Sequence, residues 1–207
     1  MGDRLTPRGS AVTPTATHDA PVGPRVGFSI IELLIVVTIM LAITAIVSPT
    51  FRISPTRRVE NAAYLVAAHL ELARSNAMGN RQLVRVDFDV AGGSYTAYAD
   101  HDSDDAITAV AAEIQAFPEF GVRGLDDLVI FGRGSAAAIP GDAGTGAVTM
   151  ANDRFLLDDQ GIPFPWGTMG TIYLTHSRDN SAVTAISVAS SGSFKAWRWW
   201  PDPGEWR

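Results

Sequence analysis

Near its N-terminus the chain has a long apolar run. No charged residue occurs from Leu33 to Phe51, and Glu32 stands directly before this run. A helix of about 20 residues rises roughly 1.5 Å per residue, which is enough to cross the ~30 Å hydrocarbon core of a bilayer. The pattern therefore predicts a membrane-spanning helix over residues 28–49.

Beyond Pro49 the pattern becomes that of a helix with one buried face. Apolar residues recur at steps of three and four, with charged residues on the other faces. The apolar positions are Val59, Ala62, Ala63, Val66, Leu70, Ala73 and Ala77. We expect this helix to end at Met78 with Gly79 as its cap, so that one long helix covers residues 28–78.

The remaining segment, residues 79–207, alternates apolar and polar residues as β-strands do. Val84 to Val90 predicts one strand, Gly92-Gly93 a turn, and Ser94 to Ala99 the returning strand. Further strands are expected over residues 107–117, 128–131, 171–175, 182–188 and 194–199, with a hairpin joining 171–175 to 182–188. Small residues dominate 132–146, which fits either an ordered loop or a flexible insert. The predicted fold class is α+β: a long N-terminal helix packed on a C-terminal antiparallel β-rich domain.

Composition supports one globular domain plus an anchor. The 207 residues are 46% hydrophobic and 18% charged, and the chain has no cysteine, which excludes disulfides and thiolate metal sites. The formal net charge is -6, and the first 27 residues carry three arginines against two aspartates, which leaves -7 for the remainder. Because this charge repels polyanions, nucleic acid is not expected as a partner.

A secretory signal peptide is the competing interpretation of the apolar run. Its apolar core usually covers about 7 to 15 residues and ends in an A-x-A-like pattern. Here the run is longer, and the best local match, Ile43-Thr44-Ala45, is poor. Arg25 precedes the run and Arg52 follows it, so the positive-inside rule does not fix the orientation.

The residues around Gly27 carry a family resemblance. Gly27-Phe28-Ser29-Ile30-Ile31-Glu32 followed by a long uncharged run resembles the class III signal of type IV pilins and type II secretion pseudopilins. The resemblance implies that a prepilin peptidase removes residues 1–27, cutting between Gly27 and Phe28, and methylates the new amino terminus of Phe28. A residue without Cβ suits a close-fitting protease cleft.

The same resemblance implies a location and partners. The protein would be a single-pass protein of the bacterial inner membrane, with residues 79–207 on the periplasmic side. Its partners would be the prepilin peptidase, other pilin or pseudopilin subunits, and the assembly platform of the inner membrane.

A lone carboxylate near the end of a membrane helix costs several kcal/mol unless it is protonated, paired or snorkelling. The resemblance gives Glu32 a partner, the positively charged terminal amine of the neighbouring subunit, which makes Glu32 a register device for assembly. The alternative is a glutamate at headgroup level, one turn inside the interface.

Four further segments resemble the minor-subunit branch often called GspH/FimT. These are residues 72–77, the strand 83–90, the stretch 185–188 and Ser191-Gly192. That branch often has a basic residue directly after the late glycine, whereas Ser193 and Phe194 precede Lys195 here. We therefore expect a minor pseudopilin or pilin subunit, and the alternative is a DNA-binding minor pilin that serves DNA uptake.

No arrangement of residues predicts an enzyme. Gly141 and Gly146 have Walker-A spacing, but Ala147 and Val148 stand where Lys and Ser/Thr are needed. The four histidines, His18, His69, His101 and His176, have no metal-ligand spacing and are interpreted as surface residues.

Calcium is the one cofactor that the sequence raises. Asp100, Asp102 and Asp104 alternate as oxygen ligands of calcium can, but Ala111 stands where an EF-hand needs glutamate. A calcium site outside the EF-hand class and a solvated, aspartate-rich turn both remain open, and no other cofactor or metal is expected.

The tail combines aromatic and basic residues. In a strand, Trp197 and Trp199 share one face with Lys195, whereas Arg198 and Trp200 share the other. These five residues either pack the edge of the β-domain, with Trp199 or Trp200 as an anchor, or form a surface for a partner or nucleic acid.

Overall fold

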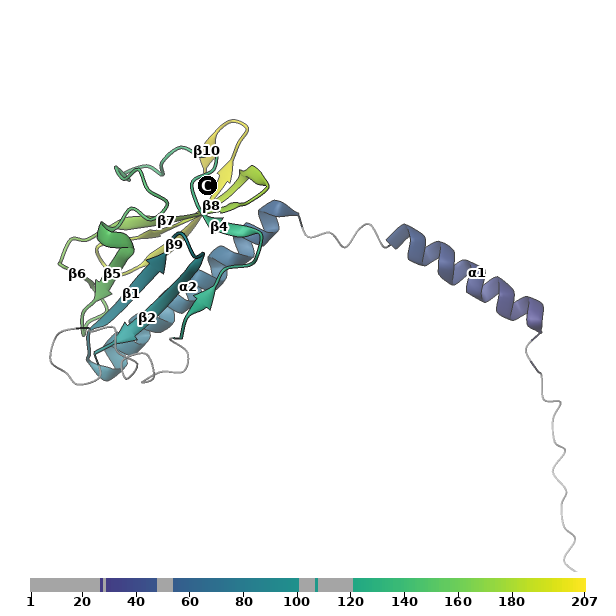
Figure 1. The fold of residues 1–207 in the computed structure, drawn as a ribbon, viewed down its shortest axis with the longest axis horizontal. Coiled ribbons are helices and arrows are strands. Elements are labelled where there is room, and N and C mark those ends of the chain that lie inside the picture. Colours follow the sequence, from purple (N-terminus) through teal and green to yellow (C-terminus); the bar gives the residue numbers. More distant parts are fainter. Residues whose placement is uncertain (1–26, 28, 48–53, 101–106, 108–120) are drawn as a thin grey trace, which may run out of the picture. The chain divides into compact units, whose positions relative to one another are not determined.

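The computed structural model describes residues 27, 29–47, 54–100, 107 and 121–207 (Figure 1). Two compact units, residues 1–51 and 52–207, divide the chain. The first unit contains helix α1 (Ile30–Val47), and the second contains helix α2 (Pro55–Asn80) and all described strands. We expected one helix over residues 28–78. Residues 48–53, between α1 and α2, lie outside the described residues.

Helix α2 begins where capping chemistry favours it. The hydroxyl oxygen of Ser54 accepts a hydrogen bond from the Arg57 N–H at 3.4 Å, and Pro55 occupies the first turn, where its missing N–H costs nothing. The seven positions of the predicted apolar stripe are the seven buried residues of α2, which confirms that prediction. Four of the seven are alanines, and their small side chains let the helix lie close to the sheets.

The predicted end of α2 was wrong by two residues. The helix continues through Gly79 to Asn80, and Arg81 takes the left-handed cap conformation with φ 52° and ψ 52°. The N–H groups of Arg81 and Gln82 both donate to the carbonyl of Ala77. These bonds satisfy the last turn, so Gly79 is not needed as the cap.

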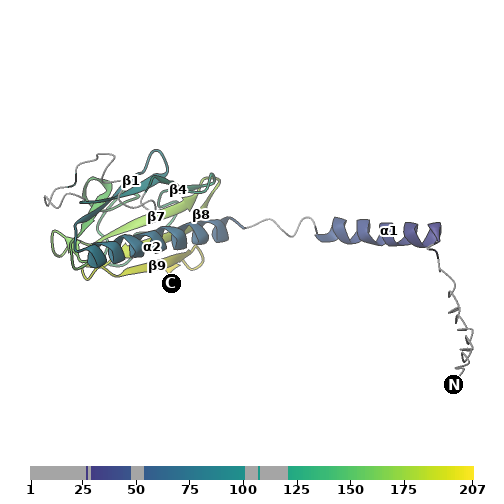
Figure 2. The same cartoon turned by 90° about the horizontal axis from the view of Figure 1, so that it is seen from below.

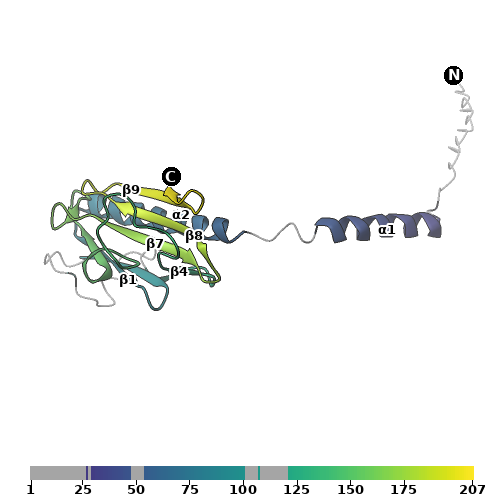
Figure 3. The same cartoon turned by 90° about the horizontal axis from the view of Figure 1, so that it is seen from above.

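Among the described residues, the strands form two five-stranded antiparallel sheets. The first sheet has the order β3-β2-β1-β5-β6 and the second has the order β10-β9-β8-β7-β4, with β9, β8, β7 and β4 side by side in Figure 3. The bounds are β1 (Val84–Asp89), β2 (Ser94–Ala99), β3 (Arg123–Gly124), β4 (Val129–Phe131), β5 (Arg154–Leu157), β6 (Pro163–Phe164), β7 (Gly170–His176), β8 (Asp179–Val188), β9 (Phe194–Trp200) and β10 (Glu205–Trp206). A short 3₁₀ turn, Ala151–Asp153, precedes β5.

Most predicted strands are confirmed. Strand β2 has the predicted bounds, β1, β4 and β9 match within a residue, and the predicted hairpin is the pair β7–β8. Strands β3, β5, β6 and β10, which have two to four residues each, were not predicted. Of the strand expected over 107–117, only Ile107 is described.

One core joins the helix and both sheets. Helix α2 packs along β7, β8 and β9 and also touches β1 (Figure 2). Ile172 and Ile186 of the second sheet meet Val86 and Phe155 of the first, and all four side chains are almost fully buried. This apolar burial is the main source of stability for the unit.

A loop covers the opposite face of the second sheet. Ala136 and Ile139 belong to residues 132–146 and pack against that face, which confirms the ordered-loop alternative. The buried Tyr173 fastens the loop, since its hydroxyl donates to the Asp142 carboxylate at 2.6 Å and accepts from the Ile139 N–H at 3.0 Å. Burial alone would raise the pKa of Asp142, but hydrogen bonds from Tyr173 and from the Gly144 N–H outweigh it and lower that pKa.

Candidate functional site

The expected cleavage segment lies at the start of α1. Gly27 is exposed, and a Cβ placed on it would meet no described atom within 4 Å. Phe28, the expected site of methylation, lies outside the described residues. The Ser29 carbonyl accepts from the N–H groups of Glu32 and Leu33 at 3.0 and 3.1 Å, so the helix begins directly after the expected cut.

Glu32 occupies the first turn of α1, where the helix dipole favours a negative charge. Its side chain is exposed, and no ion pair to it occurs among the described residues. The expected partner, an amine of a neighbouring subunit, stays a prediction.

The surface of α1 is apolar on every side. Its large apolar side chains are exposed from Ile30 to Ile43, for example Leu33 at 63% and Leu41 at 66%. The hydroxyls of Thr38 and Thr44 donate to carbonyls four residues earlier at 2.6 and 2.7 Å, so these polar groups are satisfied within the helix. Within the described ranges, no helix has both the length and the apolar character to cross a membrane.

The exposed face of α2 mixes apolar and polar side chains. Tyr64 and Leu65 are 65% and 60% exposed, and Ala68 and Met78 are exposed farther along the helix. Asn61, Glu71 and Ser75 are exposed as well, while Leu72 is half-buried and packs against the core.

The structure brings together two segments that carried the GspH/FimT resemblance. Arg74 of α2 donates from Nε to the Gly161 carbonyl at 3.1 Å and from Nη2 to the Ser191 carbonyl at 3.5 Å. Gly192 has φ 79°, and a Cβ there would collide with the Gly161 carbonyl oxygen. Residues 72–77 and 191–192 therefore form one structural junction that pins α2 to the β5–β6 and β8–β9 turns.

One face of the tail is part of the fold. As predicted, Lys195, Trp197 and Trp199 share a face, the face that the 132–146 loop covers. Trp199 is 8% exposed and packs against Trp206, whose indole N–H donates to the Ala137 carbonyl at 3.0 Å. The Lys195 ammonium lies 3.5 Å from the centroid of the Trp197 ring. Trp199 is thus the predicted anchor within the domain.

The other face of the tail is more open and meets α2. Arg198 of β9 pairs with Glu60 of α2 at 3.0 Å, and Arg207 pairs with Glu205. Both guanidiniums lie over the ring of Trp200, at 4.4 and 5.2 Å from its centroid. Trp200 is 36% exposed.

A polar cavity of about 250 Å³ lies beneath this face, between α2 and the β8–β9 pair. Its polar lining is Glu60, Tyr64, Thr184, Arg198 and Arg207. The sequence analysis singled out Arg198 but missed Glu60, Tyr64 and Thr184, because nothing in the sequence aligns the start of α2 with the middle of β8.

The calcium candidates are only partly described. Asp100 is 2% exposed at the end of β2, and its N–H donates to the Leu83 carbonyl at 2.9 Å. Asp102 and Asp104 lie outside the described residues, and within the described part of the chain no group of three or more His, Asp or Glu side chains could hold a metal ion. Calcium binding stays a prediction.

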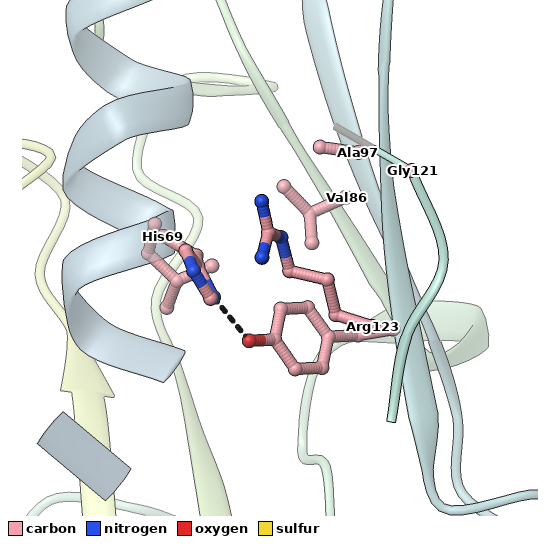
Figure 4. Close-up of a pocket in the computed structure, with 7 residues that line it drawn as sticks. His69, Val86, Ala97, Gly121 and Arg123 are labelled. Carbon is pink, nitrogen blue, oxygen red and sulfur yellow. Dashed lines mark hydrogen bonds between the residues drawn. The ribbon is translucent and has the colours of Figure 1, made fainter. Parts of the chain in front are cut away.

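The interpretation of the histidines as surface residues was wrong for two of them. His176 is buried at the end of β7, and its Nδ1 accepts from the Arg178 N–H at 3.1 Å. His69 is half-buried in a hydrogen bond with Tyr95, beside a small cavity that Arg123 also lines (Figure 4). These hydrogen bonds compensate for burial of the rings, and sequence spacing does not reveal that Tyr95 of β2 lies beside His69 of α2.

Burial also changes the protonation of this pair. It lowers the pKa of His69, with a further contribution from the positive charge of Arg123, and it raises the pKa of Tyr95 to about 12. Both rings are therefore neutral near pH 7, which suits a structural contact between α2 and β2.

Comparison with solved structures finds two kinds of similar chain. The type IV minor pilin FimU of Pseudomonas aeruginosa is 12% identical with a TM-score of 0.43, over 66% of this chain and 86% of that one. The minor pseudopilin EpsH of the Vibrio cholerae Type 2 Secretion System is 15% identical with a TM-score of 0.45, over 67% of this chain and 94% of that one. Neither a protein-family model nor a curated protein sequence matches the chain.

Proposed function

We propose that this chain is a minor subunit of a type II secretion pseudopilus or a type IV pilus. In this proposal a prepilin peptidase cuts between Gly27 and Phe28 and methylates Phe28. The helix over residues 28–49 anchors the protein in the bacterial inner membrane, and the β-rich domain lies on the periplasmic side. The protein acts mechanically, through contacts with other subunits and with the assembly platform, without catalytic turnover.

The observation that carries the proposal is the N-terminal segment itself. An exposed glycine stands directly before a helix whose one charged residue is Glu32 and whose apolar side chains are exposed around it. Such a helix needs an apolar environment, which lipid and packed helices of neighbouring subunits both supply. The uncharged run continues to Phe51, beyond the end of α1.

The second unit supports the same role. Its helix α2 buries one face on the sheets and leaves Tyr64, Leu65 and Met78 exposed on the other. Exposed large apolar side chains on a helix are suited to contacts with further subunits.

Processing tests the proposal directly. Co-expression with a prepilin peptidase should remove the first 27 residues and leave an N-methylated Phe28, as measured by intact mass and N-terminal sequencing. Gly27→Leu should stay uncut because a bulky side chain does not fit a protease cleft that closes around glycine. Gly27→Ala adds only a methyl group and should be cut in part. A mature protein that begins at any other residue contradicts the cleavage assignment.

A further inference from the structure

Strand β9 has an open edge along its first half. It is the outermost long strand of the second sheet (Figure 3), and β10 pairs only with Trp199 and Trp200 at its end. Residues 194–197 pair with β8 on one side. On their other side, no strand occurs among the described residues.

The register shows which backbone groups face the open edge. The Arg198 N–H donates to the Arg207 carbonyl at 2.8 Å and the Arg207 N–H donates back at 3.0 Å, so the backbone of Arg198 faces away from β8. In an antiparallel strand, the backbone groups of every second residue face the same side. The N–H and carbonyl groups of Phe194 and Ala196 therefore face the open edge, whereas those of the residues between them bond to β8.

A cavity of about 250 Å³ lies beside the same stretch. Ala196 and Arg198 line it from β9, and Ala63 and Tyr64 line it from α2. Ala196 is only partly buried, and Tyr64 is 65% exposed. Because the side chain of Ala196 is small, a larger side chain on a strand beside it would have room over the cavity.

These features match an extended polypeptide segment. The open edge offers a donor and an acceptor at every second residue, and the backbone of another strand presents both groups at the same spacing. Alternate side chains of such a segment would lie on the face of the sheet where the cavity is.

The exposed Lys195 indicates the charge of the segment. Its ammonium lies over the ring of Trp197, and no ion pair to it occurs among the described residues. An acidic side chain directly opposite Lys195 would be favourable, whereas two copies of β9 side by side would bring their lysines together. The charge therefore favours a segment of a different subunit over a second copy of this chain.

We propose that the open edge of β9 is a docking site for an extended segment of a different subunit, which adds to the second sheet as a strand. The backbone of the segment pairs with Phe194 and Ala196, one of its side chains lies over the cavity, and an acidic side chain lies opposite Lys195. This inference rests on the proposed function, since it assigns a contact to the subunits that assembly requires.

Hydrogen exchange measures the added backbone bonds directly. The full chain in membranes is compared with and without the other subunits, by mass spectrometry with fragmentation. The amides of Phe194 and Ala196 should exchange about tenfold more slowly when the other subunits are present. The amides of Lys195 and Trp197 should change little, because they already bond to β8. Unchanged exchange at Ala196 would mean that water occupies the edge, and it overturns the inference.

Ala196→Pro removes the outward N–H. A photoreactive benzoylphenylalanine in place of Tyr64, at the rim of the cavity, reports the docked segment. Its cross-link yield to another subunit should fall about tenfold, because proline cannot donate to the added strand and its ring stands in the way. The Tm of the isolated full chain in detergent should change little, since proline is tolerated where the N–H faces away from the sheet.

Two controls accompany this variant. Ala196→Ser keeps the N–H and should leave both the cross-link yield and the Tm nearly unchanged. Lys195→Pro removes an N–H that bonds to β8 and should lower the Tm by about 6–12 °C. A cross-link yield in Ala196→Pro equal to that in Ala196→Ser would overturn strand addition.

Lys195→Glu tests the charge of the segment. The cross-link yield should fall about two- to fivefold, because like charges directly opposite each other repel. Arg178→Glu is the matched control, since Arg178 is exposed in the turn between β7 and β8 and its reversal changes the net charge equally. Equal yields in the two variants would reject an acidic segment.

The identity of the adduct separates the remaining occupants. Adducts on nucleic acid or on a second copy of this chain overturn the inference. A second photoreactive residue at Leu41 of α1 reports assembly independently of β9. Cross-links to other subunits from Leu41, without slower exchange at Ala196, would reject the docking site and leave the proposed function standing. Cross-links to subunits from neither Leu41 nor Tyr64 would reject both.

Discussion

Glu32 is the one charged side chain in α1, and its position in the first turn gives it a favourable interaction with the helix dipole. That interaction is worth less than about 1 kcal/mol at an exposed site, whereas placing a carboxylate in hydrocarbon costs several. In the proposed membrane location, a partner outside the described chain would supply the difference. The proposed partner is an amine on a neighbouring subunit, and the alternative is a position of Glu32 at headgroup level.

Glu32→Leu should therefore separate insertion from assembly. The variant should reach the membrane and be cut after Gly27, because the helix becomes more apolar, but it should be largely absent from purified filaments. Thr38→Leu is the control, since it also removes a polar group from α1 and should be incorporated normally. Incorporation of Glu32→Leu at the wild-type level would reject the register role.

The bond between Asp142 and Tyr173 makes the covering loop sensitive to pH. The hydrogen bonds to Asp142 lower its pKa below the usual value despite its burial, so the unfolded chain binds a proton more readily than the folded chain does. The contribution of Asp142 to stability is complete above the unfolded pKa, near 4, and is lost as the pH falls through the folded pKa.

Asp142→Asn should lower the free energy of unfolding at pH 7 by about 1–3 kcal/mol and flatten its decline between about pH 5 and pH 2. Denaturant unfolding of the full chain in detergent, over a pH series, measures both effects. Asp202→Asn is the control, because Asp202 is exposed and should leave the profile unchanged. An acid profile of Asp142→Asn as steep as that of the wild type would contradict the assignment.

At the scale of elements, the end of α2 is held by two turns that are distant in sequence. Arg74 reaches the β5–β6 turn through Gly161 and the β8–β9 turn through Ser191. The close approach of the two turns leaves no space for a Cβ on Gly192. The junction gives Arg74 and Gly192 a shared structural role in this chain.

Gly192→Ala should therefore cost more stability than an ordinary glycine change. Strain at positive φ and the clash with Gly161 together should cost about 2–4 kcal/mol. Gly93→Ala is the matched control, because Gly93 also has positive φ (64°) but nothing lies within 4 Å of its Cβ position. It should cost about 1 kcal/mol. Equal losses of Tm in the two variants would show that the junction is looser than described.

At the scale of the whole molecule, charge opposes the DNA-uptake alternative. The tail cations are already engaged, Lys195 by Trp197, Arg198 by Glu60 and Arg207 by Glu205. Three cations neutralise few phosphates, and the net charge is -6. Any binding to single-stranded DNA should therefore be weak and should fade over a modest rise in salt.

Changing Lys195, Arg198 and Arg207 together to alanine tests whether the tail cations serve DNA binding or assembly. DNA retention by the full chain should be unchanged across a salt series, and incorporation into filaments should fall. A control with equal charge loss replaces three exposed arginines elsewhere, Arg57, Arg81 and Arg178. Lost DNA retention with normal incorporation, specific to the tail variant, would favour the DNA-binding alternative.

The sequence alone was sufficient for features that depend on neighbouring residues. Helical spacing identified all seven buried residues of α2, and alternation identified β1, β2, β7, β8 and β9. These predictions of helix and strand positions succeed because helix and strand periods are set by the backbone. The junction at Gly27 and the position of Glu32 are also local patterns, and the cleavage and assembly roles they suggest stay predictions.

Only the tertiary structure decided which distant residues meet. It placed Trp199 under the loop of residues 132–146, joined Arg74 to Gly161 and Ser191, and set Glu60 and Thr184 around one cavity. It also extended α2 past Gly79, because backbone N–H groups beyond the helix satisfy its last turn. Such contacts depend on packing between elements far apart in the chain, and no period within a single element encodes them.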